Sequence, residues 1–155
     1  MNAALYRGGR ARYRGAMSPT PQLYASLSVA LGGGIGALLR YQLGRLMTSW
    51  LGTQAISVFP WATLAVNALG SVLMGLLAGW LARHGPGMNE GGDQMRLLLG
   101  VGLLGGFTTF SAFSLELTML LQRGQVMIAL LYVMLSVSLG ITGLIFGLTM
   151  ARFAQ

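Results

Sequence analysis

Four long apolar stretches dominate the chain and are separated by short polar or glycine-containing segments. They cover approximately residues 25–47, 60–82, 97–121 and 126–151. Each is close to the ~20 residues that an α-helix needs to cross the hydrocarbon core of a bilayer. The pattern therefore predicts an all-α integral membrane protein with four transmembrane helices.

The third apolar stretch is interrupted near its middle by residues 105–114, which read GGFTTFSAFS. Glycine weakens a helix, and threonine hydroxyls compete for backbone hydrogen bonds. We therefore expect the third helix to be broken here. Backbone groups freed within a membrane must be buried, line a cavity or coordinate an ion. Free carbonyls suit a cation, whereas the N–H groups of a new helix start suit an anion.

Two of the predicted helices carry small and polar residues at four-residue spacing, which places them on one helix face. The second helix has Thr63, Asn67, Ser71, Gly75 and Gly79, and the fourth has Tyr132, Ser136 and Gly140. An amide without partners in hydrocarbon costs several kcal/mol, so Asn67 must face protein or water. A polar path and an interhelical hydrogen bond both satisfy this requirement. Two stripes of uncharged donors favour a path for a hydrogen-bond acceptor.

Phe110 and Phe113 are three residues apart and share a helix face. The edges of their rings are electropositive and are possible neighbours for an anion. The alternative is that both are ordinary core aromatics. Their interleaving with Ser111 and Ser114 weakens that alternative.

The composition supports the membrane prediction and excludes most enzyme chemistry. Of the 155 residues, 54% are hydrophobic and 8% are charged, compared with about 25% charged residues in soluble domains. The chain has no cysteine, and His84 is its only histidine. There is also no paired carboxylate, Ser-His-Asp set or phosphate-binding loop. We therefore do not expect an enzyme.

The net charge of +7 results from ten arginines and three acidic residues, and the chain has no lysine. Four of the arginines, at positions 7, 10, 12 and 14, lie in the first 14 residues. This distribution predicts a disordered, arginine-rich N-terminal tail at residues 1–24 and a membrane domain at residues 25–152, with no nucleic-acid binding. Translation from Met17 is an alternative that would remove most of the tail.

The remaining arginines are balanced between the two predicted sides of the membrane. One side would carry Arg83, Arg96 and Arg152, and the other Arg40, Arg45 and Arg123. Without a bias for the positive-inside rule to act on, the membrane domain can insert in either orientation.

Glycine pairs at four-residue spacing recur in all four helices: Gly32/Gly36, Gly75/Gly79, Gly102/Gly106 and Gly143/Gly147. Such pairs let helix backbones approach closely. Packing within one subunit explains any single pair. Four pairs in a chain too small to enclose a pathway also favour a dimer or larger assembly.

Three segments together resemble the fluoride channels of the Fluc (CrcB) family. They are GGFTTFSAFS, TLAVNALGS at residues 63–71 and GALLRYQLG at residues 36–44. The resemblance extends over about residues 25–152. It implies an antiparallel, dual-topology homodimer in the bacterial inner membrane, spanning the lipid several times. It also implies two pores for passive fluoride export, which give resistance to fluoride toxicity.

The resemblance also implies roles for individual residues. Asn67 resembles the pore asparagine, and Phe110 and Phe113 resemble the ring pair that faces fluoride. The implied hydroxyl donors of the pore are Ser111, Tyr132, Ser136 and, on the asparagine's stripe, Thr63. The backbone carbonyls of Gly105 and Thr108 from both chains would hold one structural Na⁺ at the dimer centre. Arg40 and Glu116 resemble a vestibule arginine and a third-helix glutamate.

The sequence departs from the family pattern at two positions. Gly140 replaces a serine or threonine that is common in relatives, and Ala112 replaces a common threonine. Two hydroxyls are therefore missing, and we assign no role to these positions.

Two other classes of protein are alternatives to a channel. A proton-coupled multidrug exporter with four helices needs a membrane-embedded carboxylate, and Glu116 would have to take that role. A non-transporting assembly protein would not need aligned polar stripes.

Overall fold

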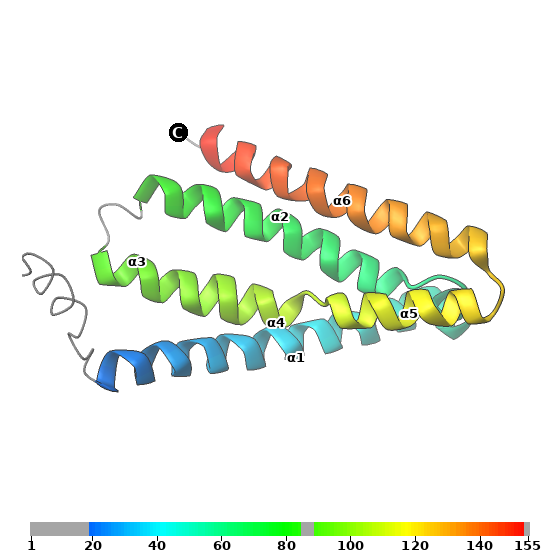
Figure 1. The fold of residues 1–155 in the computed structure, drawn as a ribbon, viewed down its shortest axis with the longest axis horizontal. Coiled ribbons are helices and arrows are strands. Elements are labelled where there is room, and N and C mark those ends of the chain that lie inside the picture. The colour runs from blue at the N-terminus through cyan, green and yellow to red at the C-terminus, as the bar shows by residue number, and fades with distance from the viewer. Residues whose placement is uncertain (1–18, 85–88, 154–155) are drawn as a thin grey trace, which may run out of the picture.

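The computed structural model describes residues 19–84 and 89–153 of the chain, which form helices joined by short connections (Figure 1). In chain order these are α1 (Pro19–Val58), α2 (Trp61–His84), α3 (Asn89–Met95), the π-helical segment η2 (Arg96–Leu104), α4 (Gly105–Phe107), α5 (Phe110–Gln122) and α6 (Val126–Phe153). Segments α3, η2 and α4 follow one another without a gap, so they form one rod that is interrupted before α5.

The prediction of four membrane-length apolar helices is confirmed. The spans cover Gln22–Val58, Trp61–His84, Gly91–Gln122 and Val126–Phe153. The start of α1 and the end of α6 lie at the same end of the bundle, as an even number of spans requires (Figure 1). The molecule is therefore a multi-pass membrane protein.

Helix α1 is longer than the apolar pattern predicted at both of its ends. It begins at Pro19, so residues 19–24 are helical, whereas residues 1–18 of the predicted tail lie outside the described residues. Near its other end, Gly52 has a φ of 80°, a conformation that glycine adopts readily. The residues after Gly52 form a separate helical turn that leads into α2.

Close helix contacts at glycine organise the bundle into two pairs, α1 with η2 and α4, and α2 with α6. A methyl group at Gly36 would overlap the carbonyl oxygen of Leu103, and one at Gly106 would lie 2.5 Å from the oxygen of Gly33. On the other pair, a methyl group at Gly75 would overlap the oxygen of Leu144. These glycines pack within one subunit, which is the first of the two explanations that the sequence allowed.

We expect Gly147→Ala to destabilise the chain, because the new methyl group would overlap the Val72 oxygen and lie 2.8 Å from the Leu76 nitrogen. Overpacking of this kind typically costs about 1–3 kcal/mol. The matched control is Gly44→Ala, where nothing lies within 4 Å and alanine favours the helix by about 1 kcal/mol. Thermal unfolding in detergent should give a lower midpoint for the first variant only. Equal midpoints would contradict this packing.

A small cluster of buried side chains lies near the α5–α6 turn. It consists of Phe59, Leu64, Leu120, Ala129 and Tyr132, with Phe113 and Leu117 among the partly buried side chains packed against it. Most other large apolar side chains in the described residues are exposed. Lipid or another chain can cover them, so the protein needs only this small internal core to fix the ends of α2, α5 and α6.

Candidate functional site

The third span is broken at Thr108 and Thr109. Both residues are extended, with φ/ψ of −78°/157° and −151°/119°, between the end of α4 and the start of α5. The sequence predicted a break within residues 105–114 and placed its cause partly in the two glycines. The structure corrects that detail, because Gly105 is still helical at φ −65° and ψ −38°. Gly106 instead provides the close contact with Gly33.

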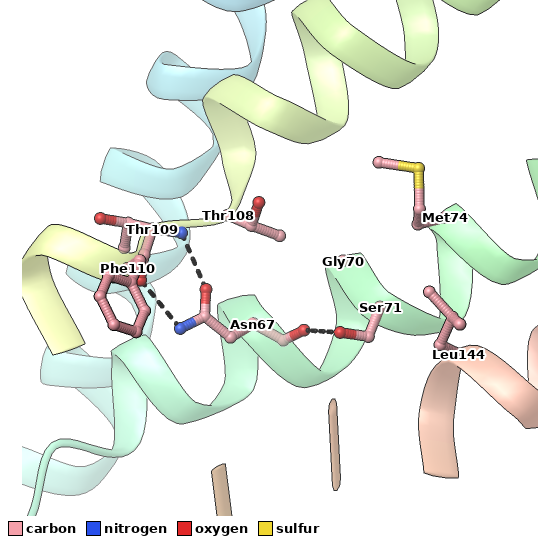
Figure 2. Close-up of a pocket in the computed structure, with 8 residues that line it drawn as sticks. All are labelled: Asn67, Gly70, Ser71, Met74, Thr108, Thr109, Phe110 and Leu144. Atoms are coloured by element: carbon pink, nitrogen blue, oxygen red, sulfur yellow. Dashed lines mark hydrogen bonds between the residues drawn. The ribbon is translucent and has the colours of Figure 1, made fainter. Parts of the chain in front are cut away.

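Asn67 of α2 holds the break through two hydrogen bonds to one residue. The Thr109 amide donates to Asn67 Oδ1 at 2.8 Å, and Asn67 Nδ2 donates to the Thr109 carbonyl at 3.0 Å (Figure 2). The interhelical hydrogen bond that the sequence left open is therefore present. An amide group carries two hydrogens on its nitrogen, so one N–H of Asn67 remains available for another acceptor.

Threonine hydroxyls complete the hydrogen bonding of the broken ends. The hydroxyl and amide of Thr108 both donate to the Leu104 carbonyl, at 2.9 and 3.0 Å. Thr109 Oγ1 accepts from the Ala112 amide at 3.2 Å and caps the start of α5. It also lies 3.2 Å from Ser111 Oγ. The predicted competition of threonine side chains for backbone groups is confirmed.

A cavity of about 280 Å³ lies against the break, between α2, α5 and α6 (Figure 2). It is lined by Asn67, Gly70, Ser71, Met74, Thr108, Thr109, Phe110 and Leu144. Phe110 is 79% exposed, so the chain itself covers little of this ring. The cavity combines one free amide N–H with threonine groups and an aromatic ring, and no ionisable side chain lines it.

Phe110 and Phe113 are neighbours, as their spacing predicted, but their surroundings differ. Their ring centroids are 5.7 Å apart. Phe113 also contacts the ring of Tyr132 at 5.1 Å and packs on the buried cluster. Phe113 is therefore partly a core aromatic residue. Phe110 is exposed and is not part of the core.

A second polar cluster joins three helices around Glu116 of α5. Thr63 of α2 donates its hydroxyl to Oε1 at 2.7 Å, and Tyr132 of α6 donates to Oε2 at 2.7 Å. The tyrosine is completely buried, at 0% exposure. Both distances are ordinary for hydroxyl hydrogen bonds. The hydroxyls of Thr63 and Tyr132 are therefore both used by the carboxyl group of Glu116.

The polar stripe of α6 continues at Ser136, one turn after Tyr132. Its hydroxyl oxygen is buried and has no hydrogen-bond partner among the described residues. Buried hydroxyls are normally satisfied, so Ser136 carries a donor that no described residue uses.

Arg40 and Glu116 do not pair with each other in the structure. Arg40 Nη1 donates to the Thr108 carbonyl at 3.4 Å, and the Glu116 oxygens accept from the hydroxyls described above. Arg40 also lines a cavity of about 550 Å³ together with Arg45, Tyr41, Gly44, Thr48, Ser49 and Ala62. A positive surface therefore lies next to the break, on the α1 side.

Sequence reasoning identified Thr63, Tyr132 and Glu116 separately and missed that they converge. The available signal was the position of Glu116, which is the only carboxylate in the apolar part of the four stretches. A buried carboxylate needs donors, and the two stripes carried hydroxyls that could supply them.

Comparison with known proteins gives one consistent family. The family described as "CrcB-like protein, Camphor Resistance (CrcB)" matches residues 27–148. The fluoride-specific ion channel FluC of Erythrobacter litoralis is 65% identical over 136 residues, which are 88% of this chain and 98% of that protein. The channel of the same name from Novosphingobium aromaticivorans is 58% identical over 128 residues, 83% of this chain and 96% of its own length. The channel of the same name from Hyphomonas neptunium is 49% identical over 126 residues, which are 81% of this chain and 94% of that protein.

Proposed function

The chain belongs to the CrcB-like family of fluoride channels, and we propose that it is a fluoride-specific ion channel through which F⁻ leaves the cell passively. The observation that carries the proposal is the set of uncharged donors around the break in the third span. One N–H of Asn67 remains free after it binds Thr109, and the exposed ring of Phe110 lines the same cavity.

These donors suit a small and strongly hydrated anion. A channel must replace the water around fluoride with other donors, yet release the ion quickly. A fixed positive charge deep in the path would hold the ion too tightly. Neutral amide and hydroxyl groups and the electropositive edges of aromatic rings bind more weakly, so they support conduction rather than storage.

The proposed path runs from the cavity at Asn67, past Ser111, Phe110 and Phe113, towards the second polar cluster. Its further donors are Ser136, Tyr132 and Thr63. Because Thr63 and Tyr132 donate to Glu116, a fluoride ion that reaches them must take over or share hydrogen bonds that now go to the carboxylate.

We infer that the working unit is an antiparallel homodimer that contacts lipid. Phe110 is 79% exposed and Gly105 is also exposed, although both lie in the middle of a span. Lipid cannot satisfy a free backbone carbonyl at that depth. The balanced arginines at the two ends allow both orientations in a bacterial inner membrane. A second copy facing the break would then cover both residues. In domain terms, residues 25–152 would form the channel, preceded by the arginine-rich residues 1–24.

A sodium ion between two such breaks would be held by backbone carbonyls. The residues fit this role, because the amide that would bond the Gly105 carbonyl in a helix donates to Asn67 instead. The Thr108 carbonyl accepts only a 3.4 Å bond from Arg40 and has a second lone pair. When bound, sodium would supply a positive charge that attracts the carbonyl oxygens of the two chains.

The proposal predicts that fluoride leaves liposomes containing the purified protein without a pH gradient. A proton-coupled exporter, with Glu116 as its working carboxylate, would need that gradient. Both oxygens of Glu116 accept hydroxyl hydrogen bonds, which supports a passive channel. Fluoride release monitored with an electrode, with and without an imposed gradient, separates the two. Release that depended on the gradient would contradict the proposal.

A further inference from the structure

The regular helical hydrogen bonds of the third span stop at the amide of Thr109. In a continuous α-helix, the N–H of residue 109 would donate to the carbonyl of residue 105. The preceding amide, that of Thr108, still donates to the Leu104 carbonyl at 3.0 Å. The Thr109 amide donates to Asn67 Oδ1 at 2.8 Å instead. The Gly105 carbonyl has therefore lost its regular helical partner to a side chain of another helix.

Asn67 can replace the helical partner of the Thr109 amide because it binds both the amide and the carbonyl of Thr109. Its Nδ2 donates to the Thr109 carbonyl at 3.0 Å (Figure 2). The two hydrogen bonds together hold Thr109 in its extended conformation. The side chain thereby replaces the helical partner of the amide and fixes the direction of the carbonyl. No other side chain in the described residues makes hydrogen bonds to both groups of Thr109.

We propose that Asn67 is a positioning residue for the sodium site, because it frees the Gly105 carbonyl to bind the cation. This inference rests on the sodium site of the proposed function. It gives Asn67 a second task beside donating its remaining N–H to fluoride. The exposed position of Gly105, in a span where lipid offers no donor, supports a cation as the partner of this carbonyl.

The two tasks of Asn67 can be separated by substitution. Asn67→Ala removes both hydrogen bonds, so the Thr109 amide can return to the Gly105 carbonyl. Asn67→Asp keeps an oxygen that accepts from the Thr109 amide, so the Gly105 carbonyl stays free. Both N–H groups are lost, which removes the bond to the Thr109 carbonyl and the donor for fluoride. Ser71→Ala is the matched control, because Ser71 lies one turn further along the same face and its hydroxyl bonds only the Asn67 carbonyl in the described residues.

The experiment is thermal unfolding of the purified full chain over a series of Na⁺ concentrations, with N-methylglucamine chloride keeping the ionic strength constant. For the unmodified chain and for Ser71→Ala, we expect the unfolding midpoint to rise with Na⁺. Asn67→Ala should need at least about tenfold more Na⁺ for the same rise, as is typical when a group that orients a metal ligand is removed. Asn67→Asp should keep a sodium response at least as strong as that of the unmodified chain.

Each contrary outcome has a definite meaning. If Asn67→Ala responds to Na⁺ like the unmodified chain, or if Asn67→Asp loses the response as Asn67→Ala does, the positioning role is overturned. If the unfolding midpoint of the unmodified chain does not change with Na⁺, there is no sodium site and Asn67 cannot position one. The proposed fluoride channel would still stand, because the efflux assay tests it separately. If Asn67→Ala does not fold, Asn67→Leu, which is close to asparagine in shape and lacks both polar groups, takes its place under the same criteria.

Discussion

Asn67→Asp is expected to reduce fluoride efflux by about 100-fold or more while the chain remains folded. The change keeps the shape of the side chain and the oxygen that accepts from the Thr109 amide. It replaces the N–H donor with a negative oxygen, so an arriving fluoride meets repulsion between like charges in a low-dielectric site. A barrier increase of about 2.7 kcal/mol is enough for a 100-fold loss. Fluoride efflux from liposomes measures the effect.

Ser71→Ala is the control for this substitution, since Ser71 lines the same cavity but donates its hydroxyl to the Asn67 carbonyl. Gel filtration should give the same elution volume for both variants and the unmodified chain. If Asn67→Asp conducts fluoride at the unmodified rate, Asn67 is not a donor to the ion. Its hydrogen bonds to Thr109 would then be its whole role.

Phe110→Ile is expected to reduce fluoride efflux by about tenfold or more with little change in stability. The ring is 79% exposed in the chain, so its removal leaves no cavity in the small core. Isoleucine has no electropositive ring edge to offer an anion, and each tenfold loss corresponds to about 1.4 kcal/mol. The same liposome assay measures the rate, and thermal unfolding measures the stability.

The matched control is Leu115→Ile, which introduces the same side chain on the same helix at a position that is 63% exposed. Leu115 lies five residues after Phe110 and so points away from its face. Equal rates for the two variants would show that the Phe110 ring does not line the path.

The four spans could be predicted from the sequence because lipid selects long apolar stretches directly. The break was predictable to within a few residues, since glycine, threonine and serine rarely occur together inside a span without a reason. Its exact position was not, because Gly105 and Gly106 looked like helix breakers. Gly106 is in fact needed for its contact with Gly33, and only the packing of α1 on α4 reveals this.

The candidate site was predictable as a list of residues and not as an arrangement. Thr63 and Asn67 belong to one stripe of α2, yet they bond to different partners, Glu116 and Thr109. Spacing along a single helix reports which residues share a face. It does not report which residue of another helix lies opposite, because that depends on the close glycine contacts that set the helices against each other.

A fluoride-specific channel must conduct fluoride and discriminate against chloride. The most direct test measures the release of both ions from liposomes that hold the purified protein, with an ionophore that lets potassium follow. We predict rapid loss of fluoride and retention of chloride over the same period. Retention of fluoride, or release of chloride as fast as fluoride, would show that the chain is not a fluoride-specific channel.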